Sequence, residues 1–205
     1  MWHEERLEAE WFAKLVEFDR QIAQAVAAKG CRHCGGPLHQ GNYERKPRGA
    51  RVASAGEAFT LRHALCCGRE GCRKRALPPS LRFLGRRVYL EAVVLLASAQ
   101  AMVVSALGRV RAVTGVPART LRRWRGWWTE AFPRSAAWTE MRARFAAPPP
   151  ADAELPLSLL DRLASSLGTA VAASDVLLLA ARWLLPVTTE SVLDGSRFAR
   201  AAFRC

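Results

Sequence analysis

Six cysteines constrain this 205-residue chain more than any other feature, because five of them lie between positions 31 and 72. Cys31 and Cys34 form a C-x-x-C pair that two glycines follow, and Cys66, Cys67 and Cys72 form a second group. The first residues carry no apolar secretory signal, so we expect a cytoplasmic chain, in which clustered cysteines bind metal rather than form disulfides. Because structural zinc sites take four thiolates, the spacing predicts one structural Zn²⁺ held by Cys31, Cys34, Cys67 and Cys72.

The second cysteine group offers one thiol too many. The alternating run from Phe59 to Leu65 predicts a strand that continues in phase to Cys67, and Gly68 permits the tight turn that a ligand at a hairpin end needs. We therefore place Cys67 in the site and keep Cys66 as the alternative. Three nearby histidines offer further ligands, although four thiolates complete the site without them: His33, His39 and His63. The metal would stabilise a ribbon of strands that is too small for a core of its own.

An amphipathic helix is predicted at the N-terminus. Apolar side chains recur at steps of three or four residues from Leu7 to Val26, and Gly30 follows them, which indicates a helix over residues 4–29. Its narrow apolar stripe suits a seam with a second subunit or a partner protein, and it suits packing on the chain's own core equally well. The sequence leaves both alternatives open.

A long hydrophobic helix is predicted to begin near Val88. The segment 88–107 is apolar enough to be compared with a membrane span, but Glu91, Ser98 and Gln100 favour a buried helix of a soluble protein. We therefore expect no membrane association.

The rest of the chain predicts further helices and one linker. Helices over residues 102–114 and 118–132 flank a turn at Gly115, the Pro-rich run 146–156 indicates a linker, and two more helices are expected beyond it. The expected fold is mainly α with a small β zinc ribbon (α+β). The last two helices are expected over 157–164 and 171–185. The expected segments of the chain are 1–30 (N-terminal helix), 31–87 (zinc ribbon), 88–145 (helix-turn-helix domain), 146–156 (linker) and 157–205 (C-terminal helical segment).

Positive charge is concentrated in two blocks. The chain has 31 Lys and Arg against 18 Asp and Glu. Residues 31–87 hold thirteen basic and three acidic side chains, a net +10, and residues 109–144 hold nine basic and two acidic ones, a net +7. All but four of the basic residues are arginine, whose planar fork fits phosphates and guanine edges. Two such blocks on an otherwise slightly acidic chain predict a polyanionic partner.

The second basic block contains a candidate recognition helix. Leu121, Trp124, Trp128 and Phe132 are spaced to form one core-facing stripe of the helix that follows the turn. The opposite face, near the start of this helix, then carries arginines where a recognition helix meets the major groove. We expect Arg119, Arg122 and Arg123 to contact bases, and Arg125, Arg109 and Arg111 to contact phosphates.

The order of these motifs resembles the zinc-ribbon plus helix-turn-helix front ends of bacterial insertion-sequence transposases and of the small DNA-binding proteins encoded beside them. The resemblance covers residues 31–132: two cysteine knuckles, basic residues after Cys72, a hydrophobic helix and the helix-turn-helix. It implies the four zinc ligands named above, and it implies base-facing positions at Arg119, Thr120 and Arg123. We also expect the basic residues that follow Cys72 to contact DNA: Arg73, Lys74 and Arg75. The chain departs from the pattern at Pro117, where a serine cap is common, and in the four residues between Cys67 and Cys72.

No catalytic pattern accompanies these motifs. The acidic residues after position 146 are scattered, Tyr43 and Tyr89 lack paired histidines, and nothing after position 146 looks like a catalytic domain. We expect a non-catalytic, sequence-specific binder of double-stranded DNA from a bacterial mobile element, acting in the nucleoid as a transposition accessory or a repressor. Its expected protein partner is a transposase or a second copy bound through the N-terminal helix. The alternatives are an RNA- or ribosome-associated zinc-ribbon protein and an adaptor that docks a partner.

Overall fold

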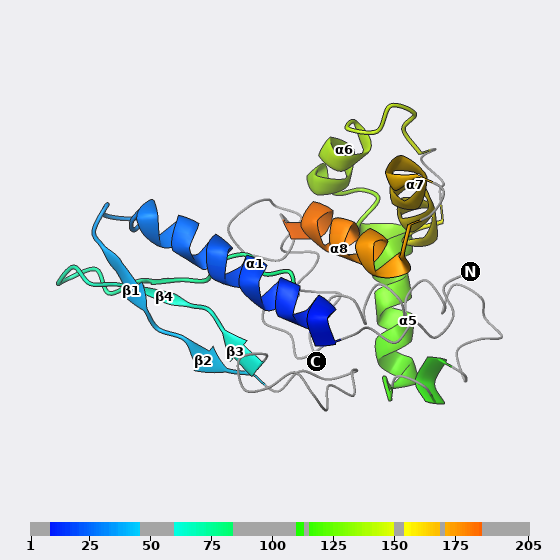
Figure 1. Cartoon of the computed structure of the whole chain (residues 1–205). Coiled ribbons are helices and arrows are strands. Elements are labelled where there is room, and N and C mark those ends of the chain that lie inside the picture. The colour runs from blue at the N-terminus through cyan, green and yellow to red at the C-terminus, as the bar shows by residue number, and fades with distance from the viewer. Residues whose placement is uncertain are drawn as a thin grey trace.

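The computed structural model describes residues 9–45, 60–83, 110–112, 115–149, 154–168 and 171–185. One long helix, α1 (Ala9–Ala28), lies along a ribbon of short strands, and the C-terminal part is helical (Figure 1). The strands are β1 (Leu38–Gln40), β2 (Tyr43–Glu44), β3 (Leu61–Arg62), β4 (Leu65–Cys67) and β5 (Arg75–Ala76). The later helices are α5 (Ala118–Gly126), the π-helical segment η2 (Trp127–Ala131), α6 (Ala136–Arg142), α7 (Leu157–Leu167) and α8 (Ala173–Leu184). Helices combined with small antiparallel sheets agree with the expected α+β class.

The strands form two small antiparallel sheets. One has the order β1–β4–β5, and the other pairs β2 with β3. The two sheets are separated where the Asn42 side chain enters the ladder: its Oδ1 accepts a hydrogen bond of 3.2 Å from the Ala64 N–H, and the Gly41 N–H donates to the Ala64 carbonyl at 2.8 Å. One continuous strand over 59–65 was therefore a wrong expectation, since this interruption divides it into β3 and β4. Residue 59 itself lies outside the described residues.

Three of the later helices follow the expected order with different bounds, and α6 is a further helix that was not expected. The helix expected over 118–132 changes to π-helical geometry at Trp127, whose carbonyl accepts a hydrogen bond of 2.8 Å from the N–H of Phe132. The first helix after the expected linker extends to Leu167 instead of residue 164, and α8 lies within the expected 171–185. The segment 102–114 is described only in part, with a helical turn at 110–112. The hydrophobic helix expected from residue 88 lies outside the described residues.

Aromatic side chains are prominent in the core. The rings of Trp128 and Phe132 lie 5.0 Å apart edge to face, and Trp138 of α6 lies 5.5 Å from Phe132. Buried side chains of α1, α7 and α8 belong to the same apolar cluster. Leu155, at the end of the expected linker, is buried in it as well. Residues from most of the expected segments therefore share one core, while the division of the chain at 146–156 stays a prediction.

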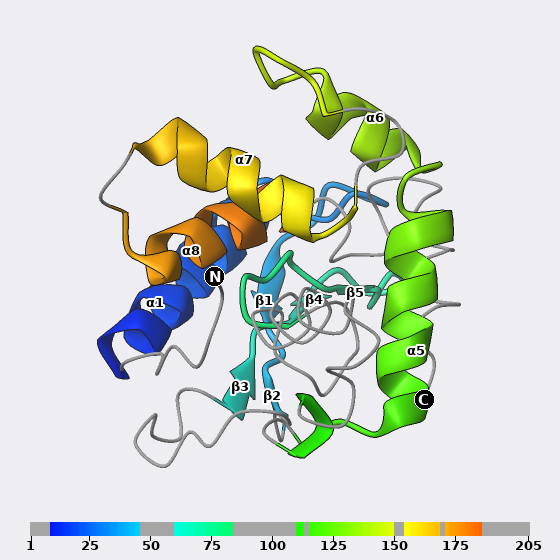
Figure 2. The ribbon, with the colours of Figure 1, turned by 90° about the vertical axis from the view of Figure 1, so that its right-hand side faces the viewer.

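Helix α1 packs on the chain's own core. Trp11 and Leu15 are buried, and Phe18 and Ile22 pack against the same cluster. The Trp11 indole Nε1 donates a 2.8 Å hydrogen bond to the carbonyl of Ser174, so α1 and α8 lie side by side, as both views show (Figures 1 and 2). The sequence left two alternatives for the apolar stripe, a seam with another chain or packing on the chain's own core. Over these residues, the stripe packs on the chain's own core.

A buried carboxylate on α1 fixes the chain that follows the ribbon. Residue Asp19 is 1% exposed, and its side chain is fully buried. Its Oδ1 accepts a hydrogen bond of 2.6 Å from the N–H of Leu81, and its Oδ2 accepts from the Ser80 hydroxyl at 2.5 Å and from Arg82 Nε at 2.8 Å. The Arg82 guanidinium donates onward to the carbonyl of Leu61 in β3 at 2.7 Å. Helix α1, the segment 80–82 and β3 are thus joined by one ionic network.

Among the helices that the structure describes, none combines the length and the apolar character that crossing a bilayer requires.

Candidate metal centre and basic surface

The four predicted cysteines come from two tight turns. Cys31 and Cys34 lie in the turn that follows α1, where the N–H of Gly35 donates to the Cys31 carbonyl at 2.7 Å and Gly30 and Gly35 have φ of +72° and +70°. Such left-handed backbone favours glycine, which explains the glycines on either side of this knuckle. Cys67 ends β4, and Cys72 lies in the turn before β5. The pairing of β1 with β4 brings the two turns together.

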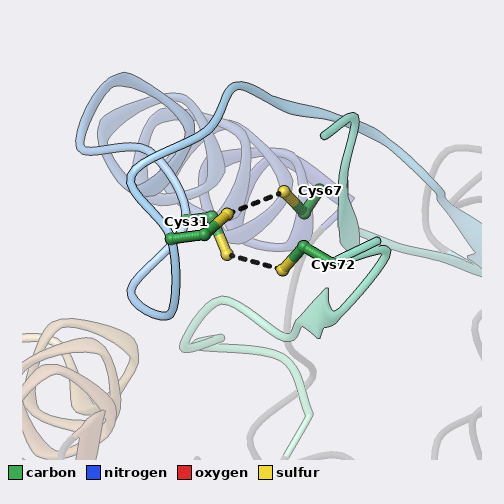
Figure 3. Close-up of side chains that lie close together, drawn as sticks. Cys31, Cys67 and Cys72 are labelled. Atoms are coloured by element: carbon green, nitrogen blue, oxygen red, sulfur yellow. Dashed lines mark hydrogen bonds between the residues drawn. The ribbon is translucent and has the colours of Figure 1, made fainter. Parts of the chain in front are cut away.

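The sulfur atoms of these cysteines converge on one point. All four Sγ atoms lie within 4.8 Å of one another. The Sγ atoms of Cys31 and Cys72 are 3.8 Å apart, and those of Cys34 and Cys67 are 3.5 Å apart; the labelled thiols face one another in Figure 3. A tetrahedral ion with metal–sulfur bonds of about 2.3 Å requires sulfurs about 3.8 Å apart. The cluster therefore has the dimensions of a four-thiolate metal site.

The electrostatics of the cluster also favour a cation. The backbone N–H of His33 lowers the pKa of the Cys31 thiol to about 7. The backbone N–H of Arg69 acts in the same direction on Cys67, yet burial and the neighbouring thiols together raise the pKa of Cys67 to about 12. The raised pKa means that, without a metal ion, the neighbouring sulfurs disfavour a negative charge on Cys67. A bound divalent cation removes the electrostatic repulsion between the thiolates, because it balances the negative charge of the sulfurs.

The structure distinguishes between the two adjacent cysteines. Cys67 is fully buried within the cluster, whereas the Cys66 thiol is directed to the backbone carbonyl of Arg73 at 3.5 Å. The backbone around Cys67 is closely packed, so two glycines leave little room for a side chain. A Cβ on Gly68 would lie 2.3 Å from Nε2 of His39, and a Cβ on Gly36 would lie 3.3 Å from Sγ of Cys67. The cluster found in the described residues consists of the four predicted cysteines, without a histidine and without Cys66.

Basic side chains surround the metal cluster. Arg73, Lys74 and Arg75 follow the last cysteine and are exposed, as are Arg32 and His33 in the first knuckle. Desolvation by neighbouring protein atoms lowers the pKa of His33, and the nearby charges of Lys74 and Arg32 lower it further, so the two turns contribute to the same positive field. The ribbon thus presents one basic end.

The candidate recognition helix has its predicted orientation. Gly115 has a φ of +68°, Val116 is buried in the turn, and Leu121, Trp124, Trp128 and Phe132 are all buried. On the other side of the helix Arg119 and Arg122 are exposed, while Arg123 and Arg125 are half-buried. Thr120 is buried, at 9% exposure, so its expected base-facing position is corrected: it lies toward the core beside Leu121. Arg111 is exposed, and Arg109 lies outside the described residues.

Sequence reasoning missed the buried ionic network. One signal was present, because Asp19 falls four residues after Leu15 and three before Ile22, within the apolar stripe of α1. A charged residue at that position indicates a buried partner. Arg62 and Arg82, both fully buried, had no comparable local signal.

Comparison of the chain with models of protein families, with curated protein sequences and with solved structures finds no match.

Proposed function

We propose that the chain is a non-catalytic, sequence-specific binder of double-stranded DNA, in which α5 is the recognition helix. The observation that carries this proposal is the placement of Arg119 and Arg122 on the exposed face of α5, directly after the turn at Gly115, with Leu121 and Trp124 buried behind them. A helix-turn-helix presents the first turns of its second helix to the major groove. Arginines there can form two hydrogen bonds with the O6 and N7 atoms of guanine.

The four-cysteine cluster is proposed to be a structural zinc site. Cys31, Cys34, Cys67 and Cys72 would hold the ion, and four thiolates in a closed arrangement are typical of structural rather than catalytic zinc. The ion would supply charge neutralisation and cross-link the two turns. The strands of the ribbon are two or three residues long, so their own packing contributes little and the metal would contribute much of the stability.

The basic end of the ribbon is proposed as a second contact with the same DNA. Arg73, Lys74 and Arg75 are adjacent and exposed, and phosphate contacts of this kind position a protein without reading sequence. Together with the net +7 of residues 109–144, they support a duplex rather than a small anion as the partner. By the resemblance described above, the DNA would be an end or an operator of a bacterial mobile element, and the chain an accessory or a repressor.

Selection from random pools tests this proposal. Zinc-loaded full-length protein is incubated in parallel with a random DNA duplex pool and a random RNA pool, and bound molecules are amplified over several rounds. We expect enrichment of one DNA sequence with defined positions of guanine. Enrichment of RNA alone would favour the RNA-associated alternative, and no enrichment in either pool would leave the docking adaptor as the better account.

A further inference from the structure

A pocket of about 470 Å³ lies between the end of α1 and the ribbon. Its apolar lining comes from α1 at Val26, from β1 at Leu38 and from β5 at Ala76, and it continues along Leu77 to Pro79. This volume lies within the range of ordinary small-molecule sites. The metal cluster and α5 contribute no lining residue, so the pocket is a separate feature.

The polar lining of the pocket is positive and aromatic. Arg32, Arg45 and Arg75 line it together with Tyr43, and no acidic side chain is present among its described lining residues. The Arg45 guanidinium lies 5.4 Å from the centre of the Tyr43 ring, and its Nη2 donates to the Tyr43 hydroxyl at 3.3 Å. The wall therefore combines the aromatic ring of Tyr43 with cationic hydrogen-bond donors.

This combination fits a planar group that carries an anion. A nucleobase can stack on tyrosine and on guanidinium planes while apolar walls exclude water, and its phosphate can be bound by arginine. Arg75 is shared between the pocket and the basic end of the ribbon. A DNA strand whose phosphates contact the basic end of the ribbon therefore passes close to the pocket.

We propose that the pocket receives one unpaired nucleotide of the bound DNA, with its base against Tyr43 and the apolar wall and its phosphate at the arginines. This inference rests on the proposed function and extends it: the chain would distinguish DNA with an unpaired base from perfect duplex. Stacking of one base on an aromatic side chain contributes enough binding free energy to predict about tenfold tighter binding of DNA with an unpaired base than of perfect duplex.

The test measures binding of full-length, zinc-loaded protein by fluorescence anisotropy to three duplexes of identical sequence. One is fully paired, one carries an extra unpaired thymine, and one carries an abasic residue at that position. We expect the unpaired thymine to tighten binding about tenfold and the abasic residue to abolish the gain. Tyr43→Leu and Arg45→Gln should lose the gain, and Val26→Phe should lose it by filling the pocket from α1. Arg20→Gln removes an exposed arginine of α1, outside the pocket lining and outside both basic blocks, and should keep it.

Zinc content and circular dichroism establish that each variant is folded. An unchanged preference for the unpaired thymine in folded Tyr43→Leu and Val26→Phe would overturn the pocket assignment. A five-nucleotide strand of thymidine, which cannot use a duplex surface, separates the two proposals: if it binds in a Tyr43-dependent way while duplexes do not bind, the proposed function fails and the pocket stands. Tighter binding of the corresponding uridine RNA, with the same dependence on Tyr43, would overturn the assignment to DNA.

Discussion

At the scale of single residues, the buried Asp19 carboxylate joins α1 to the segment that follows the ribbon. Asp19 is the acceptor for the Leu81 N–H, the Ser80 hydroxyl and the Arg82 guanidinium, and all of these groups are buried. A buried charge that loses its partner is strongly destabilising, because the remaining ion stays desolvated. Asp19 therefore decides whether the ribbon stays attached to α1.

We expect Asp19→Ala to lower the free energy of unfolding by about 3–5 kcal/mol, since Arg82 would be left buried without its counterion. Urea unfolding followed by circular dichroism measures this change. Glu17→Gln is the matched control on the same helix: Glu17 and its partner Arg20 are exposed, so stability should change little. Equal effects of the two substitutions would show that the network does not stabilise the fold.

At the scale of secondary-structure elements, the sequence predicted features that repeat along one element and missed features that depend on distant segments. The stripes of α1 and α5 were predicted because burial of an apolar face repeats with the helical period. The division of the ribbon at Asn42 and the burial of Arg62 were not predicted, because both depend on contacts with distant segments. The same is true of the change to π-helical geometry at Trp127, which accompanies the packing of two adjacent tryptophan rings 4.5 Å apart.

The metal cluster was predicted almost completely from spacing, and its choice between adjacent cysteines can be tested. We expect about one Zn²⁺ per chain, loss of that ion with Cys67→Ala, and loss of structure in the ribbon, because metal binding and ribbon folding are coupled. Cys66→Ala should retain both, since the Cys66 thiol lies outside the cluster. Elemental analysis and circular dichroism of both variants check this. A metal-free wild-type protein, or a milder effect of Cys67→Ala than of Cys66→Ala, would contradict the assignment.

At the scale of the whole molecule, α1 connects parts of the chain that are far apart in sequence. Trp11 packs in the common core and bonds to the carbonyl of Ser174, while Asp19 on the same helix holds the segment after the ribbon. The helix itself was therefore predicted correctly. Its contact partners were not predicted, because the spacing of apolar residues within one helix does not show which distant segments pack against it. Self-association through α1 stays a prediction, and it would have to use a face other than this packed stripe.

Loss of the Trp11 side chain tests this connecting role. Trp11→Ala should cost about 3–5 kcal/mol of stability, because it removes a buried aromatic side chain and its hydrogen bond. Leu167→Ala, at an exposed apolar position of α7, should stay within about 0.5 kcal/mol of the wild type. Thermal and urea unfolding compare the two. A small effect of Trp11→Ala would show that α1 is only loosely joined to the core.

The proposed recognition by α5 is tested most directly by the affinity of Arg119→Ala for two DNA duplexes, one with the selected sequence and one scrambled, over a series of salt concentrations. We expect a loss of about 1–3 kcal/mol on the selected duplex and a much smaller loss on the scrambled one, because a base contact discriminates between sequences. Arg20→Ala, at an exposed position of α1 outside both basic blocks, should leave both affinities nearly unchanged. Equal losses on both duplexes with Arg119→Ala would mean that α5 contacts only phosphate and would contradict sequence-specific recognition.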